Sequence, residues 1–184
     1  IFFDAVIYSS IMKTAFLCFA LFFIAPFLFA SSPISHYTEE KIKDFLTIRI
    51  ELKSAKDEIA LKKIDEIQHT VFSELEKNAI DFEQEKLILE SFYFMEKYEH
   101  ALDPNANRDT LRREMKTLMK RIFSCIDSRG DEKSSKWLYN VCGDVTSYYM
   151  TRSIKATLFY GLRVKEFYEK AIEKDANMTT SNVC

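Results

Sequence analysis

The residue types that most often do chemistry are few and scattered in this chain. His36, His69 and His100 are widely separated, and no cysteine or further histidine stands near them at metal-ligand spacing. Three glycines cannot supply a phosphate-cradling loop. Carboxylates are plentiful, but they stand beside lysines at helical spacing, as Glu58 does with Lys62, which is typical of a solvated helix face. The sequence therefore predicts no metal, no cofactor and no Cys-His catalytic site, and it favours a protein that is not an enzyme.

A polar stripe near the C-terminal third of the chain is the best candidate for a binding site. Five residues recur at intervals that place them on one helix face: Lys136, Asn140, Asp144, Ser147 and Thr151. On a helix that lines a groove, this face would bind a partner peptide or solute. On any other exposed helix it would simply be solvated. The binding interpretation predicts that Asn140→Ala combined with Asp144→Ala weakens partner capture without changing thermal stability.

Two charge patterns also bear on binding. Arg129-Gly130-Asp131 matches an integrin-recognition tripeptide, but a glycine between charged residues is also typical of an exposed turn between helices, and we favour the turn. One predicted helix has a basic side, formed by Arg112, Arg113, Lys116, Lys120 and Arg121. Residues 57–103 are acidic, with 13 acidic against five basic side chains. We expect these two regions to attract each other or to be solvated, rather than to bind nucleic acid.

The cysteines predict free thiols. Cys125, Cys142 and Cys184 follow the N-terminal region, and an odd number does not suit a disulfide scaffold. Around a turn near residue 130, Cys125 and Cys142 would differ in depth by roughly 12 Å, at about 1.5 Å per helical residue. That mismatch exceeds the Cα separation of about 4.4–6.8 Å that a disulfide needs. We therefore expect buried, unpaired cysteines.

The N-terminal region has the composition of an export signal. Met12 is followed by Lys13, the apolar run Ala15–Phe29 and the small residue Ala30. One positive charge, an apolar stretch and a small residue is the order found in secretory signal peptides. The run is shorter than the ~20 residues that a membrane-spanning helix needs. The sequence therefore predicts a signal peptide over residues 12–30, cleaved after Ala30.

Two further expectations follow from that signal. Residues 1–11 would be a non-native leader upstream of the true start, although an uncleaved anchor that uses Ile1–Ile7 remains the alternative. Cleavage would remove one basic and one acidic residue, Lys13 and Asp4, so the net charge would stay at −2. A charge so close to zero gives no global attraction to nucleic acid or to an anionic membrane. Membrane contact is expected only through the signal or the anchor.

The rest of the chain is predicted to be all-α. After residue 30 the glycines and prolines number only five, too few for the turns of a β-sandwich or barrel: Gly130, Gly143, Gly161, Pro33 and Pro104. Apolar periodicity predicts six helices and no strand, over residues 36–53, 54–78, 81–102, 109–127, 132–152 and 154–175. Ser54, Asp81 and Asp109 are predicted N-caps, and Gln84 is expected to reach back to the cap before it.

One segment resembles the tetratricopeptide (TPR) repeat. In Tyr160–Asn177 an aromatic, Tyr168, precedes Ala171 by three residues, and Ala171–Asn177 is similar to the exit "ALELDPN" of the second TPR helix, with Ala176 in place of proline. Tyr98–Asn105 is a second and shorter segment that resembles the same pattern. Together with Tyr148-Tyr149, these landmarks resemble long-helix bacterial periplasmic TPR proteins, including the T component associated with TRAP-type transporters. The predicted helices are longer than those of a standard repeat.

That resemblance implies a fold and a function. The fold would be a fragment of a right-handed α-solenoid, with a linker at 31–36, a TPR-like domain at 37–178 and the start of a truncated further helix at 179–184. The protein would be exported to the periplasm or envelope of a Gram-negative bacterium. It would bind a partner protein, a peptide or an apolar small solute, without a cofactor. A structural envelope protein built as an irregular helical bundle with no groove is the alternative. If a further hairpin is missing, the sixth helix would have an uncovered apolar face.

Overall fold

The computed structural model describes residues 34–181 except 54, 101–107 and 152–153, so the expected leader and signal peptide lie outside the described residues. The described residues form α-helices and one 3-10 helix, with no strand: α2 (His36–Leu52), α3 (Asp57–Asn78), α4 (Phe82–His100), α5 (Arg108–Arg129), η1 (Asp131–Lys133), α6 (Lys136–Met150) and α7 (Ile154–Ser181). The all-α prediction is confirmed.

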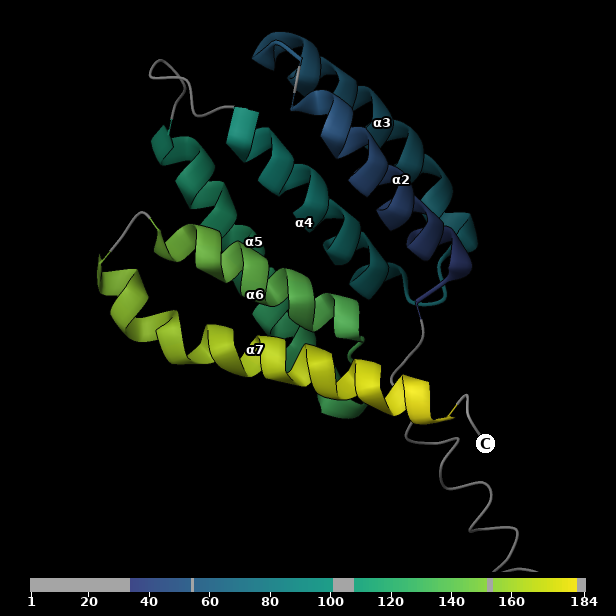
Figure 1. The fold of residues 1–184 in the computed structure, drawn as a ribbon, viewed down its shortest axis with the longest axis vertical. Coiled ribbons are helices and arrows are strands. Elements are labelled where there is room, and N and C mark those ends of the chain that lie inside the picture. Colours follow the sequence, from purple (N-terminus) through teal and green to yellow (C-terminus); the bar gives the residue numbers. More distant parts are fainter. Residues whose placement is uncertain (1–33, 54, 101–107, 152–153, 182–184) are drawn as a thin grey trace, which may run out of the picture. The chain divides into compact units, whose positions relative to one another are not determined.

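The helices pack as successive antiparallel pairs, α2 with α3, α4 with α5, and α6 with α7 (Figure 1). The first helices of neighbouring pairs also pack together, α2 against α4 and α4 against α6. In addition, α3 packs against α4, and α5 packs against α6. Each pair therefore contacts the next pair through its second helix as well as its first.

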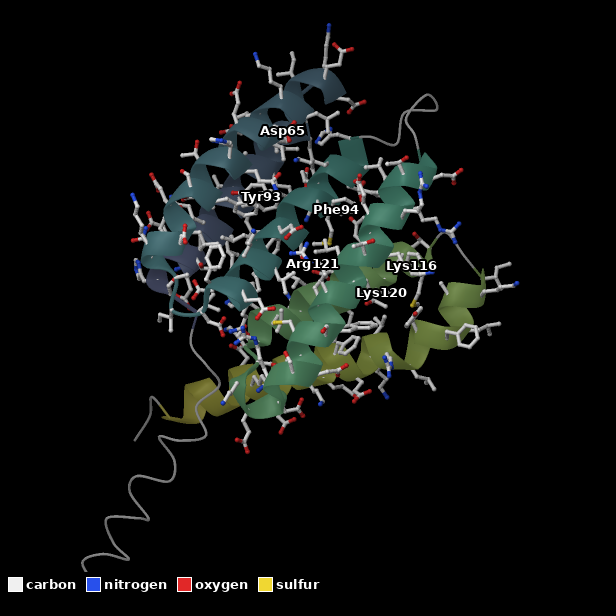
Figure 2. The ribbon with its side chains drawn as sticks, turned by 180° about the vertical axis from the view of Figure 1, so that it is seen from behind. Asp65, Tyr93, Phe94, Lys116, Lys120 and Arg121 are labelled. Carbon is white, nitrogen blue, oxygen red and sulfur yellow. The ribbon has the colours of Figure 1, made fainter. Side chains whose placement is uncertain are left out.

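Helix α4 is buried on two sides. Its buried residues include Leu87, Ile88, Leu89, Phe92, Tyr93, Met95 and Tyr98. The ring of Tyr93 lies 5.0 Å from that of Phe45 on α2. The ring of Phe92 lies 6.4 Å from that of Trp137 on α6. Figure 2 labels Tyr93 and Phe94, and Phe94 lines a hollow with residues of α5. A helix that touches neighbours on several sides needs apolar residues on more than one face.

The predicted helix caps were correct in part. The carboxylate of Asp81 accepts a hydrogen bond from the N–H of Gln84 at 3.3 Å, as a cap of α4 should. Glu85, rather than Gln84, is the residue that reaches back to the N–H of Asp81. Asp109 is not a cap, because α5 begins at Arg108 and Asp109 lies within its first turn. The proposed cap Ser54 lies outside the described residues, and Lys56 precedes α3.

Two boundaries near the C-terminus also differ from the prediction. Helix α6 begins at Lys136 rather than at residue 132. Ser135 caps the helix, because its hydroxyl oxygen accepts a hydrogen bond from the N–H of Leu138 at 3.2 Å. The residues before that cap form η1 instead. Helix α7 continues to Ser181, beyond the predicted end at residue 175, so residues 179–181 belong to the same helix.

A buried carboxylate fixes the first helix to the turn before α4. The side chain of Glu85 is fully buried and accepts hydrogen bonds from the hydroxyls of Ser35 and Thr38 at the start of α2. It also accepts hydrogen bonds from the backbone N–H groups of Ile80 at 2.8 Å and Asp81 at 2.9 Å. Four donors satisfy the carboxylate, which is the condition under which a buried charge is tolerated.

Replacement of Glu85 by alanine should lower the free energy of unfolding by about 3 kcal/mol, because two buried hydroxyls and two N–H groups lose their acceptor. Denaturant unfolding measures the change. The matched control is Glu76→Ala, an exposed glutamate on α3, which should change stability by less than about 0.5 kcal/mol. Equal stabilities for the two variants would contradict this role of Glu85.

Candidate functional site

Helix α6 has neighbouring helices on three sides, and its polar stripe lies on the side that they leave open. Trp137 contacts α4 through Phe92, and Tyr139 contacts α7 through Phe167. The backbone of α6 also packs against α5. Asn140 stands between the α4 side and the α7 side and is only partly buried. The stripe therefore borders α7 instead of lying on an isolated surface.

A groove lies between the N-terminal half of α6 and the C-terminal half of α7, with a volume of about 410 Å³. It is lined by Lys136, Trp137, Asn140, Tyr168, Ala171, Ile172 and Asp175. An ion pair between Lys136 and Asp175 joins the two helices at the groove. Ile172 is 68% exposed, so an aliphatic side chain at this groove is open to a ligand. We call these seven residues the α6–α7 groove.

Trp137 contributes an aromatic side chain to the groove. It is the only tryptophan of the chain. Its indole nitrogen is buried and has no hydrogen-bond partner within the described part of the chain. Buried donors normally have a partner, so an unpaired N–H at this position is unusual.

Asp144, the third residue of the stripe, is held by α7. The hydroxyl of Tyr168 donates a hydrogen bond to the carboxylate of Asp144 at 2.7 Å. Burial raises the pKa of Asp144 above its usual value, and the hydrogen bond from Tyr168 opposes that rise. Burial, followed by the same hydrogen bond, raises the pKa of Tyr168 to about 12. The carboxylate is therefore a structural partner of Tyr168.

Gly143 makes this arrangement possible. A Cβ atom at Gly143 would lie only 2.7 Å from Cε1 of Tyr168. The absence of a side chain lets the tyrosine ring lie against the backbone of α6, beside the carboxylate that it binds.

The structure brings together only part of the predicted stripe. Lys136 and Asn140 line the groove, whereas Asp144 is occupied by Tyr168. Ser147 lies further along α6 and Thr151 directly follows the helix, and neither lines the groove. The hydroxyl of Thr151 donates to the carbonyl of Tyr148 at 2.8 Å. The prediction for the stripe missed Trp137 and the α7 residues, although Tyr168 and Ala171 were visible as repeat landmarks.

The contact with Tyr168 changes one expectation from the sequence. Removal of the Asp144 carboxylate takes away the acceptor of a partly buried hydroxyl, so the double variant of Asn140 and Asp144 should lose stability. Asn140→Ala alone is the cleaner test of binding.

The Arg129-Gly130-Asp131 tripeptide is engaged within the fold. Both terminal nitrogens of Arg129 bond the carboxylate of Asp81. Asp131 accepts a hydrogen bond from Tyr139 and pairs with Lys170 at 2.5 Å. The contact with Lys170, and next the one with Tyr139, lower the pKa of Asp131. Gly130 has φ of 73°, which favours glycine. These contacts support the interpretation as a turn.

The basic side of α5 pairs in part with the acidic region, as predicted. Arg121 forms an ion pair with Glu90 of α4 at 2.6 Å. The guanidinium of Arg112 lies over the ring of Tyr149 at 5.7 Å. Lys116 and Lys120 are exposed on the same helix (Figure 2).

The cysteine prediction is confirmed for the two described residues. Cys125 and Cys142 are buried and free, and burial raises the pKa of both thiols. Within the described ranges, no group of three or more His, Cys, Asp or Glu side chains could hold a metal ion. A membrane-spanning helix is likewise not found in that part of the chain.

Comparison with known proteins gives no relative: no protein-family model, no curated protein and no solved structure matches the chain.

The approach of Tyr168 to α6 predicts opposite effects for two helical glycines. Gly143→Ala should lower the free energy of unfolding by about 1–3 kcal/mol, because the new methyl group collides with the tyrosine ring. Gly161→Ala on α7 meets nothing within 4 Å and should raise it by about 0.5–1 kcal/mol. Thermal and urea unfolding measure both. A neutral Gly143→Ala variant would argue against this packing.

Asp144 also predicts a pH dependence. Because burial raises its folded-state pKa above the usual 3.8, the folded protein holds this proton at pH values where the unfolded chain has released it. The stability that Asp144 contributes should therefore fall as the pH rises from 3.8 through the folded-state pKa. Urea unfolding of the wild type and of Asp144→Asn across this range measures the difference. The wild type should lose stability relative to Asp144→Asn as the pH rises, and a wild type that gains stability relative to the variant would show that the sign is wrong.

Proposed function

We propose that this protein is an exported, TPR-like helical scaffold that binds a partner protein, a peptide or an apolar small solute in the α6–α7 groove, without catalysing a reaction. The observation that carries the proposal is the groove itself. It combines an apolar side chain open to solvent, Ile172, with the ring of Trp137 and the amide of Asn140. An apolar ligand group that carries one hydrogen-bond acceptor fits that chemistry.

The order of helix packing supports the TPR-like arrangement over a closed bundle. In stacked hairpins, each first helix packs against its partner and against the first helix of the next hairpin. The pattern α2–α4–α6, with α3 on α4 and α5 on α6, follows this rule. Within the described ranges, the backbone of α7 packs only against α6, and that of α2 only against α3 and α4. A closed bundle would instead bring its last helix back to its first.

Helix length supports the particular resemblance to long-helix periplasmic TPR proteins such as the T component associated with TRAP-type transporters. Helices α3 and α5 have 22 residues each, and α7 has 28. A 34-residue repeat must fit two helices and their turns, so these helices exceed the standard unit. The composition of residues 12–30 supports export to the periplasm or envelope.

The test uses the single tryptophan as a reporter. Peptides are selected from a displayed random library on the purified protein, and their binding is followed by Trp137 fluorescence. We expect selection of apolar peptides and a change in Trp137 emission on binding. Ile172→Asp should weaken binding at least tenfold, because a carboxylate replaces an apolar contact.

The matched control for that variant is Ile59→Asp. Ile59 on α3 is 60% exposed, close to the 68% of Ile172, and lies outside the groove. The Ile59→Asp variant should bind peptides as tightly as the wild type does. Equal binding by Ile172→Asp, or peptides whose binding leaves Trp137 emission unchanged, would place binding elsewhere and contradict the proposal.

A further inference from the structure

A second surface, separate from the α6–α7 groove, lies on the first half of α7. Four large apolar side chains point to solvent there: Ile154 is 84% exposed, Leu158 81%, Phe159 78% and Leu162 88%. The opposite face of the same segment holds α7 in the fold through Ala156, which is buried, and Tyr160, whose ring lies 6.1 Å from that of Phe123 on α5. This half of α7 is therefore apolar on both faces, and only one face is covered.

Within residues 154–165, the stretch that carries these four side chains, the charges all have one sign. Residues 154–165 contain Lys155, Arg163 and Lys165 and no acidic residue. All three basic residues are exposed, although Lys165 pairs with Glu169 at 3.5 Å and the guanidinium of Arg163 lies over the ring of Phe123 at 5.7 Å. The first acidic residue of α7 is Glu166, and Glu169 and Glu173 follow it on the second half of the helix.

Helix α5 adds further positive charge beside this segment. Phe123 of α5 contacts Tyr160 of α7, and Arg112 of α5 lies over the ring of Tyr149 near the end of α6, which contacts Tyr160 in turn. Lys116 and Lys120 are exposed on α5 between Arg112 and Phe123 (Figure 2). The net charge of −2 for the whole chain therefore hides a local basic surface.

A second copy of the chain fits this surface poorly. Pairing two first halves of α7 would bring six positive charges together, with no acidic residue of either segment to oppose them. The apolar patch is also small, because a stable protein interface uses roughly 20–30 residues on each side. An apolar face edged by lysine and arginine is instead what a helix at the surface of an anionic membrane presents.

We propose that the first half of α7 docks on an anionic lipid surface. Leu158, Phe159 and Leu162 enter the boundary between headgroups and acyl chains, and the basic side chains beside them contact lipid phosphates. The acidic second half of α7, with Glu169 and Glu173, stays clear of the membrane. The contact is peripheral and does not involve the α6–α7 groove. The protein can therefore bind a partner in the groove and the membrane at the same time.

The test places an environment-sensitive fluorophore at the surface of the full chain. A genetically encoded dansyl amino acid replaces Phe159, or Ile59 on α3 as a matched exposed control. Each protein is titrated with vesicles of phosphatidylglycerol and phosphatidylcholine and with vesicles of phosphatidylcholine alone. We expect a blue shift of the emission at position 159 on the anionic vesicles and none at position 59, even if the N-terminal segment tethers both proteins.

Charge reversal checks the electrostatic part. Lys155→Glu with Lys165→Glu should raise the lipid concentration for half of the shift at least about tenfold. Lys56→Glu, just before α3, combined with Lys62→Glu on α3 changes the net charge equally and should leave that lipid concentration unchanged. Three outcomes would overturn the proposal: no shift at position 159, an equal shift on phosphatidylcholine alone, or a blue shift that needs no vesicles and rises with protein concentration. The last result would show a second copy on this face.

Discussion

The double burial of α4 is the constraint on which the rest of the structure depends. Tyr93 packs toward α2 and α3, and Phe92 packs toward α6, so one helix is shared by the pairs before and after it. A helix shared in this way makes the pairs stack one after another. The same stacking leaves α7 with α6 as its only backbone neighbour in the described ranges. Both candidate surfaces lie on α7 for that reason.

Polar contacts then determine how each pair sits on the next. Glu85 fixes the start of α2 to the turn before α4, and Arg121 joins α5 to α4 through Glu90. Between α6 and α7, Gly143 lets Tyr168 lie against the backbone and bind Asp144. Because α7 is aligned along α6 in this way, Ile172 of α7 and Trp137 of α6 line the same groove.

Apolar periodicity was sufficient to predict the helices, because a buried face must repeat every 3–4 residues. It predicted the ends less well. Asp109 looks like a cap in the sequence but lies inside α5, and Ser135 was missed because its role depends on η1, which breaks the chain before α6. For the site, the sequence placed Lys136 and Asn140 on one face. It could not show that Tyr168, 24 residues after Asp144, would bind that carboxylate.

The central claim is that a ligand binds between α6 and α7, and the single indole of Trp137 allows a direct measurement. In a ¹H–¹⁵N spectrum this side chain gives one indole resonance, from an N–H that has no partner within the described residues. The account predicts that a bound peptide shifts this resonance and shows nuclear Overhauser contacts to it and to Ile172. An unchanged indole resonance, with peptide contacts on other helices instead, would contradict the account.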